Sequence, residues 1–149
     1  MDLFLVVWLI GILTVWPVWF WLSITSRRKR GVPLIPKPPA NTQFCERGAS
    51  GNQEGHLLAN AKNCLLVCVA DGVLWVTPTF PFNLIAPYGV MGLEHRVPLA
   101  NVYDVEFRQG MFGGGRVRLR IAPNGQAHAA TLNLSLKAPD VFIKVVGKR

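Results

Sequence analysis

The sequence lacks the short motifs that identify many hydrolases, nucleotide-binding enzymes and redox proteins. It contains no G-x-S-x-G, no G-x-x-x-x-G-K-[ST] and no paired C-x-x-C. Its three histidines, His56, His95 and His128, are widely scattered and do not show the spacing of metal ligands. We therefore predict that the protein is not an enzyme and has no catalytic residues, no metal site and no cofactor. A small enzyme with an unrecognised site is the weaker alternative.

Cysteine is also scarce, and Cys45, Cys64 and Cys68 form an odd set of three. On a single strand, residues 64 and 68 would point to the same face about 13 Å apart, which is too far for a disulfide. The odd count and this spacing favour buried, reduced cysteines. Reduced cysteines are typical of a cytoplasmic domain.

Acidic side chains are few, since 8 Asp and Glu stand against 16 Lys and Arg, for a formal net charge of +8. Such a charge suits a surface that meets anionic lipid or nucleic acid. In the alternating segments described below, however, the aromatic and basic side chains lie on opposite faces, whereas nucleic-acid binding would place them together. We expect the lipid bilayer as a partner and no nucleic acid.

Charge is absent from the run between Leu3 and Thr25, which is almost entirely apolar. A helix of this length would measure about 34 Å, enough to cross the ~30 Å hydrocarbon core of a bilayer. We predict a transmembrane helix over residues 1–26. A cleaved signal peptide is the alternative, but the cations follow the run and no A-x-A pattern is present.

Four cations follow the apolar run directly: Arg27, Arg28, Lys29 and Arg30. Because Lys and Arg mark the cytoplasmic side, we expect a single-pass protein of the cell (inner) membrane with its N-terminus outside and residues 27–149 in the cytoplasm. The same four side chains are candidate contacts for anionic lipid headgroups. Alternatively, they only set the topology.

The next segment, residues 27–55, is predicted to be a basic juxtamembrane stretch followed by a linker. It contains four prolines between residues 33 and 39, and then a polar stretch with little apolar material to order it. Residues 56–149 remain as one domain, which is long enough to build its own core.

Short strands joined by turns are the main pattern of this domain. Asp71-Gly72 between two apolar runs is a strong hairpin signal, and residues 102–108 and 116–121 each alternate between apolar and charged side chains. Pro139 and Asp140 suit the start of a helix that closes the chain. The predicted strands are 64–69, 73–77, 96–99, 102–108, 116–121 and 129–136.

This pattern resembles a pleckstrin-homology-like (PH-like) barrel of the bacterial PH or GRAM type, over about residues 63–146. The residues that carry the resemblance are CLLVCVADGVLWVT, HRVPLANVYDVEFR, GRVRLRI and the closing KAPDVFIKVV. The resemblance implies a mainly β fold, with a small antiparallel barrel or sandwich and a C-terminal helix behind the transmembrane helix. It also implies a binding scaffold whose usual ligands are lipid headgroups and proteins. Residues 78–92 depart from the family pattern because they are longer and more apolar than a plain connection.

An arginine stripe on residues 116–120 is the sharpest candidate site. If the strands around the glycine-rich turn pair symmetrically, Glu106 lies opposite Arg118 and Asp104 opposite Arg120. These two pairs describe an ordinary solvated face. Arg108 and Arg116 then lie opposite each other without a carboxylate partner. We predict this pair as the candidate anion site.

The apolar segment 78–92 offers a second candidate surface through Phe80, Phe82, Leu84 and Ile85. It could insert into the membrane interface or meet a partner protein. Alternatively, it folds back and caps one end of the barrel.

These observations predict a non-catalytic, membrane-anchored binding or scaffolding module that recognises a membrane-protein partner at the cytoplasmic face. The alternative is a module that binds an anionic lipid headgroup. The sequence does not specify the oligomeric state.

Overall fold

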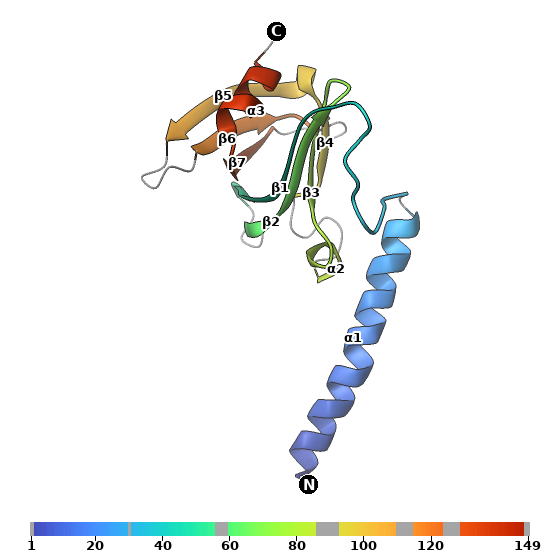
Figure 1. Ribbon diagram of the computed structural model, residues 1–149. Coiled ribbons are helices and arrows are strands. Elements are labelled where there is room, and N and C mark those ends of the chain that lie inside the picture. Colours follow the sequence, from blue (N-terminus) through green and yellow to red (C-terminus); the bar gives the residue numbers. More distant parts are fainter. Residues whose placement is uncertain are drawn as a thin grey trace.

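The computed structural model describes residues 2–29, 31–55, 60–85, 93–109, 115–123 and 129–147. A long N-terminal helix, α1 (Leu3–Lys29), extends away from a β domain that carries a short helix at each end (Figure 1). Helix α1 is long and apolar enough to cross a membrane, as the sequence predicts. The mainly β fold with an N-terminal apolar helix and a C-terminal helix is confirmed.

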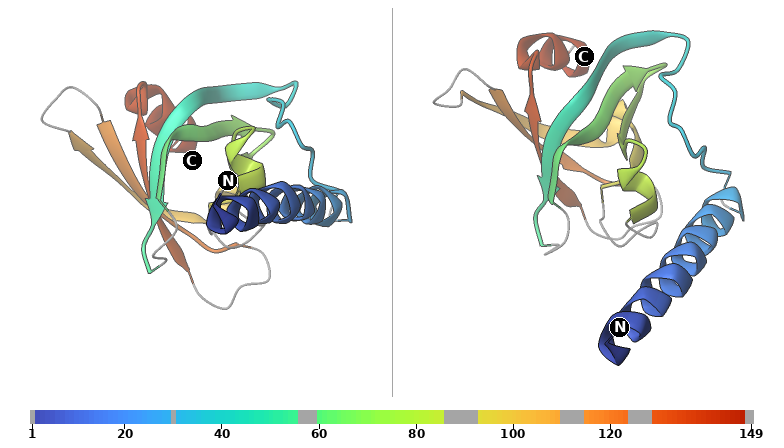
Figure 2. Two further views of the ribbon diagram at one scale, coloured as in Figure 1. Left: turned by 90° about the horizontal axis from the view of Figure 1, so that it is seen from below. Right: turned by 60° about the horizontal axis from the view of Figure 1, so that its bottom comes forward.

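Seven antiparallel strands form one curled sheet in the order β4-β3-β2-β1-β7-β6-β5. Figure 2 shows that the sheet is curled into a half-barrel. A 3-10 turn at Leu99–Asn101 joins β4 to β5. The strands are β1 (Thr42–Gln53), β2 (Asn60–Ala70), β3 (Val73–Pro78), β4 (His95–Pro98), β5 (Val102–Gln109), β6 (Gly115–Ile121) and β7 (Ala130–Leu136).

The alternating strands build the core because every second side chain points inward. Val117, Leu119 and Ile121 of β6 are fully buried, and so are Leu132 and Leu134 of β7. The hairpin at Asp71-Gly72 is also present, and both of its residues have positive φ (50° and 72°), as a tight two-residue turn requires. The predictions for these strands are confirmed.

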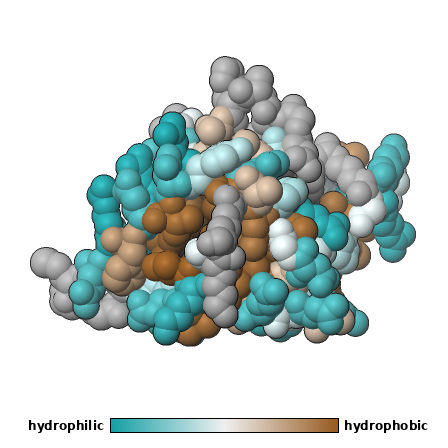
Figure 3. Space-filling model, turned by 90° about the horizontal axis from the view of Figure 1, so that it is seen from above, coloured by the Kyte–Doolittle hydropathy of each residue, from teal (hydrophilic) through white to brown (hydrophobic). Residues whose placement is uncertain are grey.

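Helix α3 (Pro139–Val146) closes one end of the half-barrel. Its Phe142 is fully buried and packs edge-on against Phe44 of β1, with ring centroids 5.2 Å apart. Seen from this end of the molecule, apolar side chains gather on the surface within a hydrophilic rim (Figure 3). Val141 of α3 and Phe107 of β5 are among the exposed large apolar residues.

The prediction of a linker over residues 27–55 is wrong for residues 42–53, which form β1. This strand pairs with β2 on one side and with β7 on the other, so it lies in the middle of the sheet. Irregularities in its pairing with β2 interrupt the period of two, and few of its side chains are apolar. Its backbone pairing with two neighbours fixes it in the sheet. The β domain therefore begins at Thr42 rather than near residue 56.

The remaining part of the predicted linker lies across the outer face of the sheet. Residues 31–39 face Leu66 and Cys68 of β2 and Trp75 of β3 across a hollow of about 300 Å³. Leu66 and Cys68 are consequently buried although they point away from the core. Strand β2 is thus covered on both faces, which explains its continuous apolar run.

The structure also differs from the prediction of three reduced cysteines, since two of them face each other across neighbouring strands. Cys45 of β1 lies directly opposite Cys68 of β2, and the two form a disulfide. The distance between residues 64 and 68 does not bear on this pair, and the sequence does not predict that Cys45 lies on a strand. Cys64 is free and buried, and burial raises the pKa of its thiol.

Candidate functional site: an arginine-lined hollow

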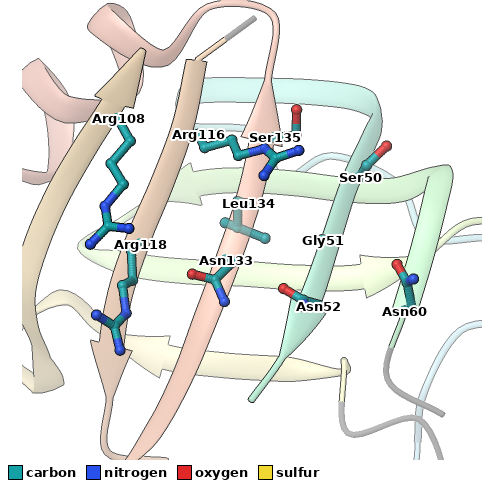
Figure 4. Close-up of a pocket in the computed structure, with 10 residues that line it drawn as sticks. All are labelled: Ser50, Gly51, Asn52, Asn60, Arg108, Arg116, Arg118, Asn133, Leu134 and Ser135. Carbon is teal, nitrogen blue, oxygen red and sulfur yellow. The ribbon is translucent and has the colours of Figure 1, made fainter. Parts of the chain in front are cut away.

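Polar side chains line a hollow on the outer face of the sheet, above strands β1, β7, β6 and β5. The hollow has a volume of about 390 Å³. Figure 4 shows its side chains in two rows, each of which crosses neighbouring strands. One row consists of Ser50, Ser135, Arg116 and Arg108, and the other of Asn60, Asn52, Asn133 and Arg118.

The register of the sheet creates these rows. Ser135 of β7 pairs with Ser50 on one side and with Arg116 on the other, and Arg116 in turn pairs with Arg108. Asn133 likewise pairs with Asn52 and with Arg118. Since alternate residues of a strand point to the same face, each pairing places one more polar group beside the last.

The hollow exists because the residues of β1 and β7 that line it are short, whereas the arginines beside them are long. Gly51 lies at the floor, and a Cβ atom added there would come within 2.8 Å of Leu134 Cδ2 and 3.0 Å of Asn133 O. A glycine is therefore needed for the close approach of β1 to β7. On β1 the hollow is lined by the short side chains Ser50 and Asn52, while Arg116 and Arg118 stand at its other side (Figure 4).

Two of the three arginines have carboxylate partners. Arg118 contacts Glu54 at 3.2 Å and Glu106 at 4.0 Å, and Arg108 contacts Glu106 at 3.6 Å. The Nε atom of Arg118 is buried and has no hydrogen-bond partner among the described residues. Arg116 forms no ion pair within the described part of the chain. Arg116 is therefore the cation best able to accept an external anion.

Glu54 binds two of the side chains that line the hollow, Asn133 and Arg118. Asn133 Nδ2 donates a hydrogen bond to its carboxylate at 3.2 Å, and Arg118 donates another at the same distance. The hydrogen bond from Asn133, followed by that from Arg118, lowers the pKa of Glu54 below its usual value. Glu54 is thus ionised at neutral pH, and it cancels part of the positive charge of the arginines.

The predicted strand register is confirmed at two of three positions. Arg108 lies opposite Arg116, and Glu106 lies opposite Arg118. The third pairing is wrong, because an irregularity in β5 places Tyr103 opposite Arg120. Asp104 has a positive φ of 48° at this irregularity, and its carboxylate still reaches Arg120 at 3.3 Å.

The predicted juxtamembrane cations have different surroundings. Arg28 and Lys29 are exposed at the end of α1, and Arg30 lies outside the described residues. Arg27 is only 2% exposed, so the expectation that it contacts lipid headgroups is wrong. Its two terminal nitrogens donate to Glu94 at 3.0 and 3.2 Å.

Helix α2 (Phe82–Ile85) contains part of the predicted apolar surface. Phe80 and Phe82 are exposed, at 54% and 46%, whereas Leu84 is buried. The side chain of Ile85 and residues 86–92 lie outside the described part of the chain. The surface predicted from these residues is therefore divided, with the two phenylalanines facing outward.

Sequence reasoning missed the neutral part of the hollow. Asn133 and Ser135 alternate along β7, and this period of two was a signal that a polar row would face outward. Ser50 and Asn52 give no such signal, because the sequence predicts a linker for their segment. For Arg118 the sequence predicts only a solvated side chain.

Among residues 2–29, 31–55, 60–85, 93–109, 115–123 and 129–147, no group of three or more His, Cys, Asp and Glu side chains could hold a metal ion. Comparison of the chain with models of known protein families, with curated proteins and with solved structures finds no match in any of the three. The candidate site therefore has to be interpreted from its own chemistry.

Proposed function

We propose that this protein is a single-pass membrane protein whose β domain is a non-catalytic module that binds an anionic headgroup. The observation that carries the proposal is the position of Arg116, which has no ion-pair partner in the described part of the chain, beside neutral Asn and Ser side chains in one hollow. A guanidinium can bind a phosphate or carboxylate through two parallel hydrogen bonds. The amides and hydroxyls beside it suit a headgroup that also carries hydroxyl groups.

The sequence resemblance to PH-like domains supports the same proposal. The curled antiparallel sheet that ends in a single helix agrees with the architecture that the resemblance implies. Such domains usually act as binding scaffolds. A PH-like domain on a membrane anchor would meet headgroups at high local concentration, because α1 contacts the domain directly and only residues 30–41 connect α1 to β1.

We also propose that the β domain lies in the cytoplasm and the N-terminus outside. The cations at the end of α1 support this orientation. The disulfide between Cys45 and Cys68 favours the opposite orientation, since lasting disulfides form in oxidising compartments. We give the charges more weight because they direct insertion, whereas two facing cysteines can also exist as thiols.

Recognition of a membrane-protein partner, the function favoured by the sequence, is the second candidate. The exposed Phe80 and Phe82 are the observation in its favour, because exposed aromatic side chains are common in interfaces between proteins. This candidate requires no ligand in the arginine-lined hollow.

The test uses the full chain in nanodiscs of neutral phosphatidylcholine. We would titrate it by calorimetry with the soluble headgroup analogue glycerophosphoglycerol, and with zwitterionic glycerophosphocholine for comparison. We expect the anionic analogue to bind and Arg116→Ser to weaken its binding about tenfold or more, since a hydrogen bond to a charged group contributes about 1.5–3 kcal/mol.

Arg120→Ser is the matched control, because Arg120 lies on the same strand and face but outside the hollow. It should leave the affinity nearly unchanged. If both variants weaken binding equally, the hollow has no special role and only the general positive charge matters. If the anionic analogue does not bind to the unmodified chain, the headgroup proposal is wrong and protein recognition takes its place.

A further inference from the structure

Two exposed phenylalanines lie beside the cationic end of the membrane-spanning helix. Phe80 precedes α2 and Phe82 begins it, and α2 is in contact with α1. In Figure 1, α2 lies at the end of the β domain that faces α1, while α3 lies at the opposite end. The arginine-lined hollow plays no part in this arrangement.

A buried cluster of hydrogen bonds and one ion pair fixes the position of α2 along the axis of α1. Arg27 Nε donates a hydrogen bond to the backbone carbonyl of Asn83 at 3.0 Å, and the same guanidinium binds Glu94. Asn83 Nδ2 donates to the carbonyl of Leu34 at 2.6 Å, so the chain that leaves α1 joins the same cluster. Arg27 thus joins α1 to α2 and to Glu94, and Asn83 adds the segment that follows α1.

The burial along α1 shows where the β domain contacts it. Ser23 and Arg27 are 7% and 2% exposed, whereas Trp21 and Leu22 are largely exposed. Ser23 and Arg27 are one helical turn apart and lie on the same side of the helix, about 6 Å apart along its axis. The domain therefore packs against the last turns of α1.

These last turns coincide with the boundary between hydrocarbon and headgroups. The apolar run ends at Thr25, and Trp19 and Trp21 lie within two helical turns before that end, with Trp16 slightly deeper. Indole rings gather at the interfacial level of a membrane, and cations mark its polar side. A segment held against Ser23 and Arg27 lies at this same level.

The orientation of the side chains around α2 agrees with a lipid neighbour. Asn83 and Leu84 are buried against the protein, whereas Phe80 and Phe82 face outward. Aromatic side chains beside a polar rim are suited to the boundary between headgroups and acyl chains. The continuity of this surface with a membrane-spanning helix favours lipid over a protein partner as its occupant.

We propose that Phe80 and Phe82 insert into the interfacial region of the bilayer next to the C-terminal end of α1. The β domain is then held to the membrane at two points, by the spanning helix and by these phenylalanines. This inference rests on α1 crossing the membrane and is independent of headgroup binding in the hollow, so either can fail alone.

The test places a fluorescent label at the proposed contact in the full chain. Phe82→Cys and Val141→Cys are prepared separately, labelled with an environment-sensitive maleimide dye and reconstituted in phosphatidylcholine vesicles. Val141 is the matched control because it is 50% exposed and belongs to α3 at the other end of the domain. The unmodified chain measures the background from the free, buried Cys64.

We expect a lipid with a nitroxide near its headgroup to quench the label at residue 82 several times more than the label at residue 141. Aqueous iodide should show the reverse preference. Phe80→Cys, labelled in the same way, should behave like Phe82→Cys. This second site protects the test against a local disturbance at residue 82.

Two results would overturn the inference. Equal quenching of residues 82 and 141 by iodide, with little effect of the nitroxide lipid, would place the phenylalanines in water. Protection of residue 82 from both quenchers would indicate that protein covers this surface. Neither result would bear on the affinity of the hollow, which is measured by a separate titration.

Discussion

Arg27, Arg28 and Lys29 are neighbours in the sequence but have different surroundings. Arg28 and Lys29 are exposed, while Arg27 binds Glu94 and the carbonyl of Asn83. The sequence pattern could not separate them, because the partners of Arg27 lie more than fifty residues later in the chain. Cationic residues after an apolar run identify a membrane boundary, but they do not show which of them are paired.

We predict that Arg27→Ala lowers the free energy of unfolding by about 3–5 kcal/mol, where unfolding includes the loss of the contact between the β domain and α1. Removing one member of a buried ion pair leaves the charge of the other, here Glu94, buried without a partner. The measurement is thermal and denaturant unfolding of the full chain in nanodiscs. Arg28→Ala is the control and should change the stability by less than about 0.5 kcal/mol. Equal stability of the two variants would show that the Arg27 contact is not important.

The arginines of the hollow show how far residue-level prediction extends. A symmetric hairpin was enough to place Arg108 opposite Arg116 and Glu106 opposite Arg118. The irregularity at Asp104 could not be foreseen, because a non-glycine residue with positive φ leaves little trace in the sequence. The ion pair with Arg120 survived because long side chains tolerate such a displacement.

At the scale of elements, the strands found from the sequence are those with a regular period of two. Strand β1 was missed because its apolar residues are few and irregular, although it pairs along both edges. Strand β1 forms because β2 and β7 offer backbone hydrogen-bonding partners on both of its edges. This is a tertiary effect that outweighs local propensity.

Strand β1 also supports α3 through Glu46. Its carboxylate accepts hydrogen bonds from the backbone N–H groups of Lys137 and Ala138, at 2.8 and 3.2 Å. No side chain of α3 itself caps its N-terminus, where Ala138 occupies the cap position. A carboxylate near a helix N-terminus is also favoured by the helix dipole.

We predict that Glu46→Ala destabilises the docking of α3 by about 1–2 kcal/mol, because two charge-assisted hydrogen bonds are lost. The readout is hydrogen–deuterium exchange of the α3 amides, which should become faster in the full chain. Glu46→Gln keeps an acceptor oxygen and should have a smaller effect. Unchanged exchange in Glu46→Ala would show that Phe142 alone holds the helix in place.

At the scale of the whole molecule, the cations at the end of α1 and the disulfide favour opposite sides of the membrane for the β domain. The cations at the end of α1 favour a cytoplasmic β domain, and the facing Cys45 and Cys68 can form a disulfide wherever conditions are oxidising. Both observations agree if the cytoplasm keeps this pair as thiols.

We predict that in spheroplasts an N-terminal epitope tag is accessible from outside and the β domain is protected from added protease. Cys45 and Cys68 should be thiols under these conditions and should close to a disulfide after treatment with diamide. The measurement combines proteolysis of spheroplasts with thiol alkylation and gel mobility. A digested domain that carries a disulfide before any oxidant is added would reverse the orientation.

The order of strands also bears on how the chain is made. The central strand β1 follows α1 and the short connection after it, yet one of its two neighbours, β7, is the last of the seven described strands along the chain. During translation one edge of β1 must therefore remain unpaired until β7 has left the ribosome. Pairings so distant in sequence form slowly, and exposed strand edges are prone to associate with other chains. If α1 spans the bilayer, as proposed above, it can already be inserted by then, and the domain would complete its folding while tethered at the membrane surface.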